Sequence, residues 1–575
     1  MECITPHGGG RMSEQHYRQA MGVFPIFKQG IRILFLTPKD IYDFFDKGTR
    51  FHFLRYVAML DALYCLYLFL FAVLTGGHYL LAIVFTALSA GGLYAVSNIV
   101  DRIGGWFSWY PGLGYRTSNG TFKPLFARSS LAGSGAAKAG ETHVRGSAVF
   151  DGAAMAKEMK RGAGNADLSN VIQIGGVPVP PNSEQQHFLF SGAPGAGKTQ
   201  SINALLRTVR ARGQAALIAD PAGGYLSRFY RSGDLVLNPF DVRSEDWSPF
   251  AEIRHPYDCM RIAKAAIPDA PDGKDGEWQF YAQTLLCEAL RSLHEQGNNS
   301  VKELLRLVMS AEAKELATIL AGTAAATLTA KGNEKMLSNT RAIAAAYLNP
   351  WTYLNDGGTF SLRAWVQKSD TNGGKWLFLP YRAGQLAMLK NLLATWLDLA
   401  QSEGLELSES RSRRLWFVMD ELDSLGKVGT LKMGLTQLRK YGGVVVAGLQ
   451  FLSQLQTTYG KEEAKTLMAG MATKLVLRVD DDEGVEAMSK ILGDQEVIRP
   501  ETSNSTSTRA GELPSTSENN STRNVEQRTV MASEISTLPD LHGFLKLPGL
   551  PIARVQLEYV PAPELFPAFV AKEAA

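Results

Sequence analysis

"FLFSGAPGAGKTQ", residues 188–200, is an apolar run followed by a glycine-rich loop, a lysine and a threonine. Gly192, Gly197, Lys198 and Thr199 match the spacing G-x-x-x-x-G-K-[ST], and "TQSINALLRTVRAR" continues with a helical pattern. A strand, a glycine loop and a helix in this order are the context in which the motif binds phosphate. The stretch therefore predicts a phosphate-binding loop in an α/β fold.

The residue types of the loop suit a nucleoside triphosphate. Glycines let backbone N–H groups close around phosphate oxygens, and the helix N-terminus adds its partial positive charge. We expect Lys198 to reach the β- and γ-phosphates of ATP and the Thr199 hydroxyl to ligate Mg²⁺. The predicted nucleotide contacts are Gly192, Ala193, Pro194, Gly195, Ala196, Gly197, Lys198, Thr199 and Gln200.

A second motif, "RRLWFVMDELDSL" at residues 413–425, supplies carboxylates. The continuous apolar run 415–419 is typical of a strand buried on both faces of a parallel sheet. Asp420 and Glu421 follow at its carboxyl end, where ligands bind in open α/β sheets. We expect Asp420 to hold Mg²⁺ through water and Glu421 to orient or deprotonate the attacking water.

Other apolar, β-branched runs alternate with helical patterns before and after these motifs, which predicts a mostly parallel sheet covered by helices. Residues 171–254 and 350–575 form the two parts of this predicted nucleotide-binding domain. Between them, over 255–349, only helical spacing remains, which predicts an inserted all-α domain. The insert suits either a cap that faces the substrate or a module that only supports the sheet, and spacing does not separate the two.

Gln450 follows the predicted strand "GVVVAGLQ" and would also stand above the carboxyl edge of the sheet. A polar side chain at this place can sense the γ-phosphate and report hydrolysis. Taken alone, a single glutamine is more often a surface residue.

The N-terminal part contains two apolar runs, 57–75 and 79–97, joined by a short turn. Each is close to the length that a helix needs to cross a bilayer, so residues 57–100 predict a transmembrane hairpin. The alternative is a buried helical hairpin of a soluble core. Basic residues flank the hairpin on both outer sides, which places the termini and the soluble body in the cytoplasm. Residues 1–56 would then be a cytoplasmic segment and 101–170 a Gly/Ala-rich linker.

Bulk composition excludes several classes of protein. A hydrophobic share of 45% and a charged share of 20% argue against wholesale disorder. The net charge of +3 is too small to indicate nucleic-acid binding by itself. Four scattered cysteines without a CxxC pair argue against a disulfide framework and a zinc knuckle. Any DNA contact must therefore come from local geometry.

Taken together, the hairpin, "GAPGAGKT", the helical insert, "LWFVMDEL" and "VVVAGLQFLSQLQTTYG" resemble the type IV coupling proteins, the TrwB/TraD-type ATPases of conjugation and type IV secretion. The resemblance covers about 500 residues, and residues 1–45 do not obviously match. It implies a RecA-like motor that forms a homo-hexameric ring on the bacterial inner membrane. Such a motor would pump single-stranded DNA, with its bound relaxase, toward the secretion channel.

The same resemblance assigns roles to two further residues. Arg439, in "LRKYGG", would be an arginine finger that reaches the nucleotide of the neighbouring subunit, although by composition it is one of a solvated basic pair. Asp220, in "IADPAGG", would lie near the phosphates, and a helix cap after a strand explains it equally well. The Ser/Thr/Asn-rich stretch 501–524 predicts a mobile loop within a projecting hairpin.

Competing functions remain. A transporter ATPase with an LSGGQ-like signature is excluded, because "GLELSESRSRRLWFVMD" carries none. A coupling ATPase for protein effectors without a DNA step stays open. A nucleotide-gated cargo receptor is the third alternative, and Glu421 argues against it because simple binding needs no carboxylate aimed at water.

Overall fold

The computed structural model describes residues 114–116, 122–124, 141–163, 170–270, 276–507 and 515–572. The predicted N-terminal segment 1–56 and transmembrane hairpin 57–100 lie outside the described residues. Within the described part of the chain, no helix is long and apolar enough to cross a membrane.

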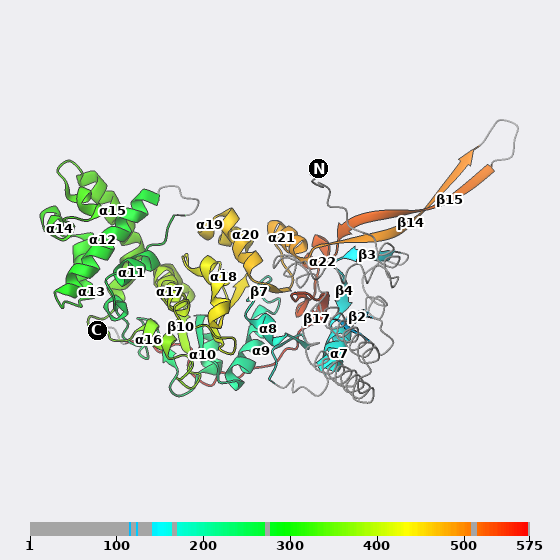
Figure 1. The fold of residues 1–575 in the computed structure, drawn as a ribbon, viewed down its shortest axis with the longest axis horizontal. Helices are drawn as coiled ribbons and strands as arrows, with labels where there is room; N and C mark the ends of the chain where they lie inside the picture. Colours follow the sequence, from blue (N-terminus) through cyan, green and yellow to red (C-terminus); the bar gives the residue numbers. More distant parts are fainter. Residues whose placement is uncertain are drawn as a thin grey trace, which may run out of the picture. The chain divides into compact units, whose positions relative to one another are not determined.

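A ten-stranded sheet forms the centre of the described chain (Figure 1). Only β16 runs antiparallel to its neighbours, and the other pairs are parallel. In spatial order the strands are β4 (Val149–Asp151), β17 (Ile552–Gln556), β16 (His542–Lys546), β13 (Thr473–Val476), β7 (Phe188–Ser191), β12 (Gly443–Leu449), β11 (Leu415–Met419), β8 (Ala216–Pro221), β10 (Leu377–Tyr381) and β9 (Leu235–Val236).

The central strands are apolar throughout because helices cover both faces of the sheet. Along β11, Phe417 and Met419 belong to one hydrophobic cluster, while Trp416 and Val418 belong to another. This alternation is the period of two that a strand imposes on its side chains. The mostly parallel α/β sheet predicted from the apolar runs is therefore confirmed.

Helices on one face are α7 (Gly152–Ala163), α9 (Lys198–Ala211) and α10 (Gly224–Phe229), whose apolar residues join the Trp416 cluster. The Phe417 cluster takes in α17 (Ala383–Gly404), α18 (Leu431–Tyr441), α19 (Leu452–Tyr459), α20 (Lys461–Gly470), α21 (Asp482–Leu492) and α22 (Ala532–Ser536). The short helix α8 (Pro181–Glu184) precedes β7.

Between β9 and β10 the described residues form helices and no strand apart from isolated bridges. These helices are η1 (Pro249–Glu252), α11 (Asp258–Ala266), α12 (Gly276–Glu295), α13 (Val301–Met309), α14 (Ala313–Ile319), η3 (Ala324–Thr329), α15 (Glu334–Leu348), η4 (Asn349–Tyr353) and α16 (Leu362–Gln367). Leu286 and Leu290, one turn apart on α12, and Leu304 of α13 are fully buried in the Phe417 cluster, so the insert shares its core with α17.

Smaller sheets complete the described chain. They are β1 (Gly114–Arg116) with β2 (Phe122–Pro124), β5 (Gln173–Ile174) with β6 (Val177–Pro178), and β3 (Thr142–Gly146) with β14 (Asp494–Ser507) and β15 (Ser515–Arg528).

Two predicted segments contain more regular structure than expected. The Gly/Ala-rich linker 101–170 includes β4, a strand of the central sheet, and the helix α7, in which Met155 is fully buried. Three residues are too short a run to be recognised as a strand by periodicity. The stretch 501–524, predicted as a mobile loop within a projecting hairpin, extends β14 and β15 as a paired ribbon up to Ser507 and Ser515, so the paired part of the hairpin is longer than expected (Figure 1). Its backbone ladder forms without apolar side chains.

A buried cluster of charges joins the insert to the helices that cover the sheet. Glu403 of α17 is 1% exposed and accepts from Arg363 Nε of α16 at 2.6 Å. Arg363 also pairs with Asp258 of α11 at 2.8 Å, and Arg254 and Arg261 lie 3.4 Å from Glu403. The Arg363 guanidinium thus bridges two buried carboxylates from different parts of the chain.

Replacement of this bridging cation should strongly destabilise the protein. Arg363→Met leaves Asp258 and Glu403 with less compensation, which should lower the free energy of unfolding by about 3 kcal/mol. Urea denaturation followed by tryptophan fluorescence measures the change. The matched control is Arg528→Met, which removes the exposed pair with Asp494 and should change stability by less than about 1 kcal/mol. Equal losses in the two variants would contradict the bridging role.

Candidate functional site

The phosphate loop connects the buried strand β7 to the first turn of α9. Gly195 and Gly197 adopt left-handed φ angles of 80° and 117°. The φ of Gly197 favours glycine, and a Cβ there would also lie 2.9 Å from Leu541 Cδ2, which would have to shift. Gly197 is also the N-cap of α9, and no side chain caps the first N–H groups of the helix. The start of α9 therefore presents N–H donors to the loop.

Backbone hydrogen bonds from three neighbouring segments hold the loop. Gly192 N donates to Leu449 O at 3.1 Å, and Ala193 N donates to Arg478 O at 2.6 Å. On the other side, Leu541 N donates to Ala196 O at 3.0 Å. The ends of β12 and β13 and the residue before β16 thus fix the shape of the loop.

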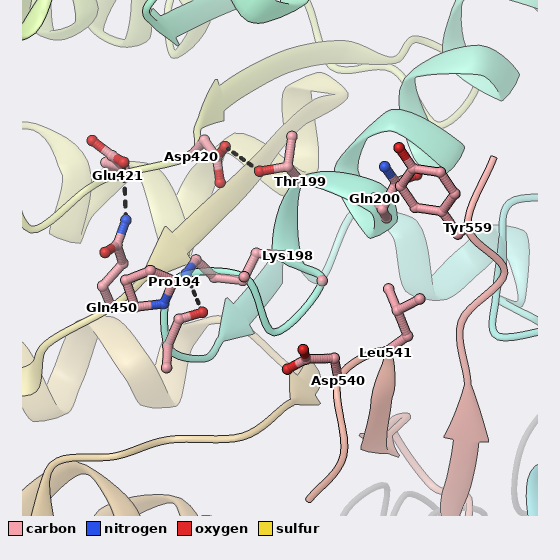
Figure 2. Close-up of a pocket in the computed structure, with 13 residues that line it drawn as sticks. Pro194, Lys198, Thr199, Gln200, Asp420, Glu421, Gln450, Asp540, Leu541 and Tyr559 are labelled. Carbon is pink, nitrogen blue, oxygen red and sulfur yellow. Dashed lines mark hydrogen bonds between the residues drawn. The ribbon is translucent and has the colours of Figure 1, made fainter. Parts of the chain in front are cut away.

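Lys198 lies at the centre of the site (Figure 2). Its Nζ donates to Gly192 O at 2.5 Å and to Ala193 O at 3.4 Å, so the ammonium is folded over the loop. Burial lowers the pKa of Lys198 below its usual value, although the charges of three nearby carboxylates oppose the shift. Those carboxylates belong to Asp420, Asp423 and Glu421.

Asp420 follows β11 and faces the first turn of α9. Its Oδ2 accepts from Thr199 Oγ1 at 3.4 Å and from Tyr225 Oη at 2.6 Å. Its Oδ1 is buried and has no hydrogen-bond partner in the described chain. Burial raises the pKa of Asp420, and the hydrogen bond from Tyr225 opposes this rise. One carboxylate oxygen is therefore held in place and the other is left for a further ligand.

Glu421 and Gln450 meet across the ends of two adjacent strands, β11 and β12. Gln450 Nε2 donates to Glu421 Oε1 at 2.9 Å (Figure 2). The backbone N–H groups of Gln450 and Phe451 donate to Asp423 Oδ2 at 3.3 and 3.0 Å. Burial raises the pKa of Glu421, and the charges of Asp420 and Asp423 raise it further. A carboxylate with a raised pKa is a stronger base, which suits the activation of water.

A cavity of about 530 Å³ gathers these groups. Its lining consists of Ala193, Pro194, Gly195, Gly197, Lys198, Thr199, Gln200, Asp420, Glu421, Gln450, Asp540, Leu541 and Tyr559. The structure thus brings together most of the residues singled out in the sequence. Gly192 and Ala196 belong to the loop but do not line the cavity.

Asp220 does not line the cavity, and its surroundings match the helix-cap explanation that the sequence left open. It is fully buried, and its two carboxylate oxygens accept from the backbone N–H groups of Tyr225 and Leu226 at 2.9 and 2.7 Å. Burial raises the pKa of Asp220 to about 7, and the two hydrogen bonds oppose the rise. Asp220 therefore holds the turn before α10 and thereby places Tyr225 against Asp420.

Arg439 lies away from this cavity. It is exposed in the last turn of α18, which leads into the start of β12, whereas Gln450 follows the end of β12. The two residues therefore lie toward opposite ends of β12, and Arg439 does not line the cavity.

The residues present fit a phosphate chain and Mg²⁺. Mg²⁺ prefers hard oxygen ligands in a strict octahedral geometry and keeps several waters. Thr199 supplies a hydroxyl, and the buried Oδ1 of Asp420 supplies a carboxylate oxygen without a protein partner. The N–H groups of the loop and the ammonium of Lys198 suit the phosphates of a nucleotide.

Sequence reasoning missed several residues of the site. Tyr225 and Tyr559 carry no local signal, since each reaches the site only through the packing of a distant element. Asp423 did carry one, because it is the third acid of the run "DELD" directly after the strand.

Comparisons with known proteins agree with this geometry. The family model for the type IV secretion-system coupling protein DNA-binding domain matches residues 171–558. The coupling protein TraD of Escherichia coli (strain K12) is 30% identical over 428 residues, which cover 73% of this chain and 58% of that protein. The chain thus spans less than two thirds of the length of this curated relative.

Solved structures of the bacterial conjugative coupling protein TrwB are also similar. An unbound form of TrwBdeltaN70 has a TM-score of 0.69 and 34% identity, covering 77% of this chain and all of that one. A complex of TrwB with ADP and Mg²⁺ has a TM-score of 0.68 and 34% identity, with 76% and 100% coverage. With the RecA-like sheet, the phosphate loop and a family match over most of its length, this chain belongs to the type IV secretion-system coupling proteins.

Proposed function

We propose that this chain is a coupling ATPase of the bacterial inner membrane that pumps single-stranded DNA, with its bound relaxase, into a type IV secretion channel during conjugation. The observation that carries the proposal is the contact between Gln450 and Glu421 beside Lys198, at the end of the phosphate loop. A receptor that only bound nucleotide would not need a base and a polar sensor at this place.

ATP hydrolysis needs a bound triphosphate and an oriented water. Lys198 and the loop N–H groups would hold the β- and γ-phosphates, and Thr199 and Asp420 would hold Mg²⁺. When bound, Mg²⁺ would offset the negative charge that develops during transfer of the terminal phosphoryl group. Glu421 orients the attacking water and takes its proton, and Gln450 keeps Glu421 pointed toward that position.

Gln450 connects this chemistry to the rest of the motor. Its side chain bonds to Glu421, and its backbone bonds to Asp423. A change at the γ-phosphate therefore reaches both the segment after β11 and the start of α19. Such a change is what a motor needs in order to convert hydrolysis into movement.

The family and the sequence support the proposed assembly and location. The hairpin 57–100 would anchor the chain with both termini in the cytoplasm. In a homo-hexameric ring, Arg439 would act on the nucleotide of the neighbouring subunit, where its charge stabilises the transition state only when the subunits are docked. Its exposure on α18 is compatible with that role.

The DNA cargo is supported by the matched family, which is described as a DNA-binding domain, and by relatives described as conjugative coupling proteins. Partners would then be single-stranded DNA, the relaxase and components of the secretion channel. A coupling ATPase for protein effectors is the alternative.

Removal of the proposed base should abolish turnover and preserve binding. Glu421→Gln keeps the size and the polar contact with Gln450, so we expect ATP affinity within threefold of wild type. We expect kcat to fall by a factor of about 100 to 10,000. Phosphate release by the full chain in detergent, with and without single-stranded DNA, measures kcat, and mating assays measure DNA transfer. Unchanged kcat would remove Glu421 from the mechanism.

Lys198→Ala is the matched variant for binding. It should weaken ATP binding as well as turnover, because the phosphates lose their contact with the Lys198 ammonium.

Wild-type ATPase activity that rises strongly when single-stranded DNA is added would support a DNA pump. Basal activity that DNA does not change would favour protein cargo instead.

We expect the Tyr225 hydroxyl to affect how tightly the site binds Mg²⁺, because it donates a hydrogen bond to Asp420. Tyr225→Phe removes the hydroxyl that orients Asp420, so the Mg²⁺ concentration for half-maximal activity should rise roughly tenfold. Binding of Mn²⁺ to the nucleotide-loaded protein, followed by electron paramagnetic resonance, gives a second readout. Tyr459→Phe is the control, since it removes a buried hydroxyl that bonds to Val428 N outside the cavity. If both variants need the same metal concentration as wild type, Tyr225 does not position the ligand.

A further inference from the structure

The cavity has a second end that the proposed hydrolytic residues do not use. Figure 2 shows Glu421 and Gln450 on one side of the phosphate loop and Gln200, Leu541 and Tyr559 on the other. If the terminal phosphate lies next to Glu421, the remainder of a nucleotide extends toward this second end. The side chains there are aromatic, aliphatic and amide, and the carboxylate of Asp540, which lies beside Leu541, is paired with Arg478 at 2.6 Å.

Tyr559 presents a free aromatic face. Its side chain is 64% exposed, although it lines the cavity. The backbone on both sides of it is nevertheless anchored: Leu557 N donates to Leu541 O at 2.7 Å, and Val560 O accepts from Arg207 of α9 at 3.3 Å. The segment after β17 thus holds the ring in place next to the helix that follows the phosphate loop.

Leu541 ties this segment to the loop itself. Its N–H donates to Ala196 O, and its carbonyl accepts from Leu557 N. Leu541 also has a φ of 64°, a left-handed conformation that is uncommon for a residue other than glycine. Backbone conformations of this kind persist where the surroundings impose them, and they concentrate at ligand sites. The position of Tyr559 is therefore set relative to the phosphate loop by two consecutive hydrogen bonds.

Gln200 adds a polar group to this end of the cavity. It is the second residue after Lys198, and its Oε1 is buried without a hydrogen-bond partner in the described chain. A planar ligand ring with polar edges, bound at this end of the cavity, would contact the aromatic face of Tyr559, the aliphatic side chain of Leu541 and the amide of Gln200. A nucleobase has these properties, and a phosphate or a metal ion does not.

We propose that Tyr559 is the stacking platform for the nucleobase of the bound nucleotide, with Leu541 and Gln200 as the other walls of this subsite. The inference rests on the proposed ATPase function and adds the base-binding part of the same site. Tyr559 lies just beyond the family match, which ends at residue 558. Because every base offers a π-face, the subsite accepts different nucleobases.

The test compares two ligands that differ in the base and ribose. Calorimetry on the full chain in detergent with Mg²⁺ measures binding of ATP and of inorganic tripolyphosphate. Tyr559→Ala should weaken ATP binding roughly tenfold, since base–aromatic stacking contributes on that scale. Its affinity for tripolyphosphate should stay within twofold of wild type, and Tyr559→Trp should bind ATP as tightly as wild type.

The control is Tyr257→Ala, which removes a tyrosine with the same 64% exposure from a position outside the cavity. It should leave both affinities unchanged. The proposal is overturned if Tyr559→Ala binds ATP like wild type, or if it loses ATP and tripolyphosphate equally, because the ring would then support only the loop.

These binding measurements, combined with the measurement of phosphate release, separate this inference from the proposed function. Wild-type protein that binds ATP with Tyr559-dependent affinity but does not hydrolyse it would refute the ATPase and support the subsite. Wild-type protein that hydrolyses ATP, with normal binding in Tyr559→Ala, would refute the subsite alone.

Discussion

Three neighbouring parallel strands end at the same edge of the sheet, and the site depends on that coincidence. β7, β12 and β11 are hydrogen-bonded side by side, so the phosphate loop, Gln450 and the Asp420–Glu421 pair emerge next to one another. β12 alone lies between β7 and β11, so Thr199, in the first turn of α9, reaches Asp420 at 3.4 Å although 221 residues separate them. Backbone bonds from the ends of the adjoining strands then give the loop one shape. Any change that shifted the strand register would dismantle the site.

The buried charges at that edge make the site selective for a cation and an anion together. One ammonium, Lys198, faces the carboxyl groups of Asp420, Glu421 and Asp423, and burial raises the pKa of each of these three acids. Buried charges are costly unless they are compensated. A divalent cation compensates the acids, while a phosphate chain meets Lys198 and the loop N–H groups. Each ligand therefore makes the binding of the other more favourable.

The segment that follows the acid pair makes a hydrogen bond to the inserted helical region. Lys427 Nζ donates to Asp269 O at 3.3 Å, just after α11, and also pairs with Glu463 of α20 at 3.2 Å. Thr430 N donates to the buried Asp398 of α17 at 2.7 Å. Asp423 bonds to the backbone of Gln450 and Phe451 near the start of this segment, so hydrogen bonds link the surroundings of Glu421, through the segment, to the stretch just after α11. That geometry suits a machine in which the nucleotide site and the inserted helices move together.

The sequence by itself determined the phosphate loop, the acid pair after β11 and the alternation of apolar strands with helices, because each depends on local spacing. Tertiary structure decided between the two explanations of Asp220 that the sequence left open, and it alone showed that Tyr225 orients Asp420 and that Tyr559 lines the cavity. Three-residue β4 escaped prediction because it is too short to show an apolar pattern. The hairpin of β14 and β15 was expected, but the length of its polar ladder was not, since backbone hydrogen bonds rather than apolar side chains form it. Contacts between distant segments produce no periodic pattern in the amino-acid sequence. They form only after the sheet has brought particular strand ends next to one another.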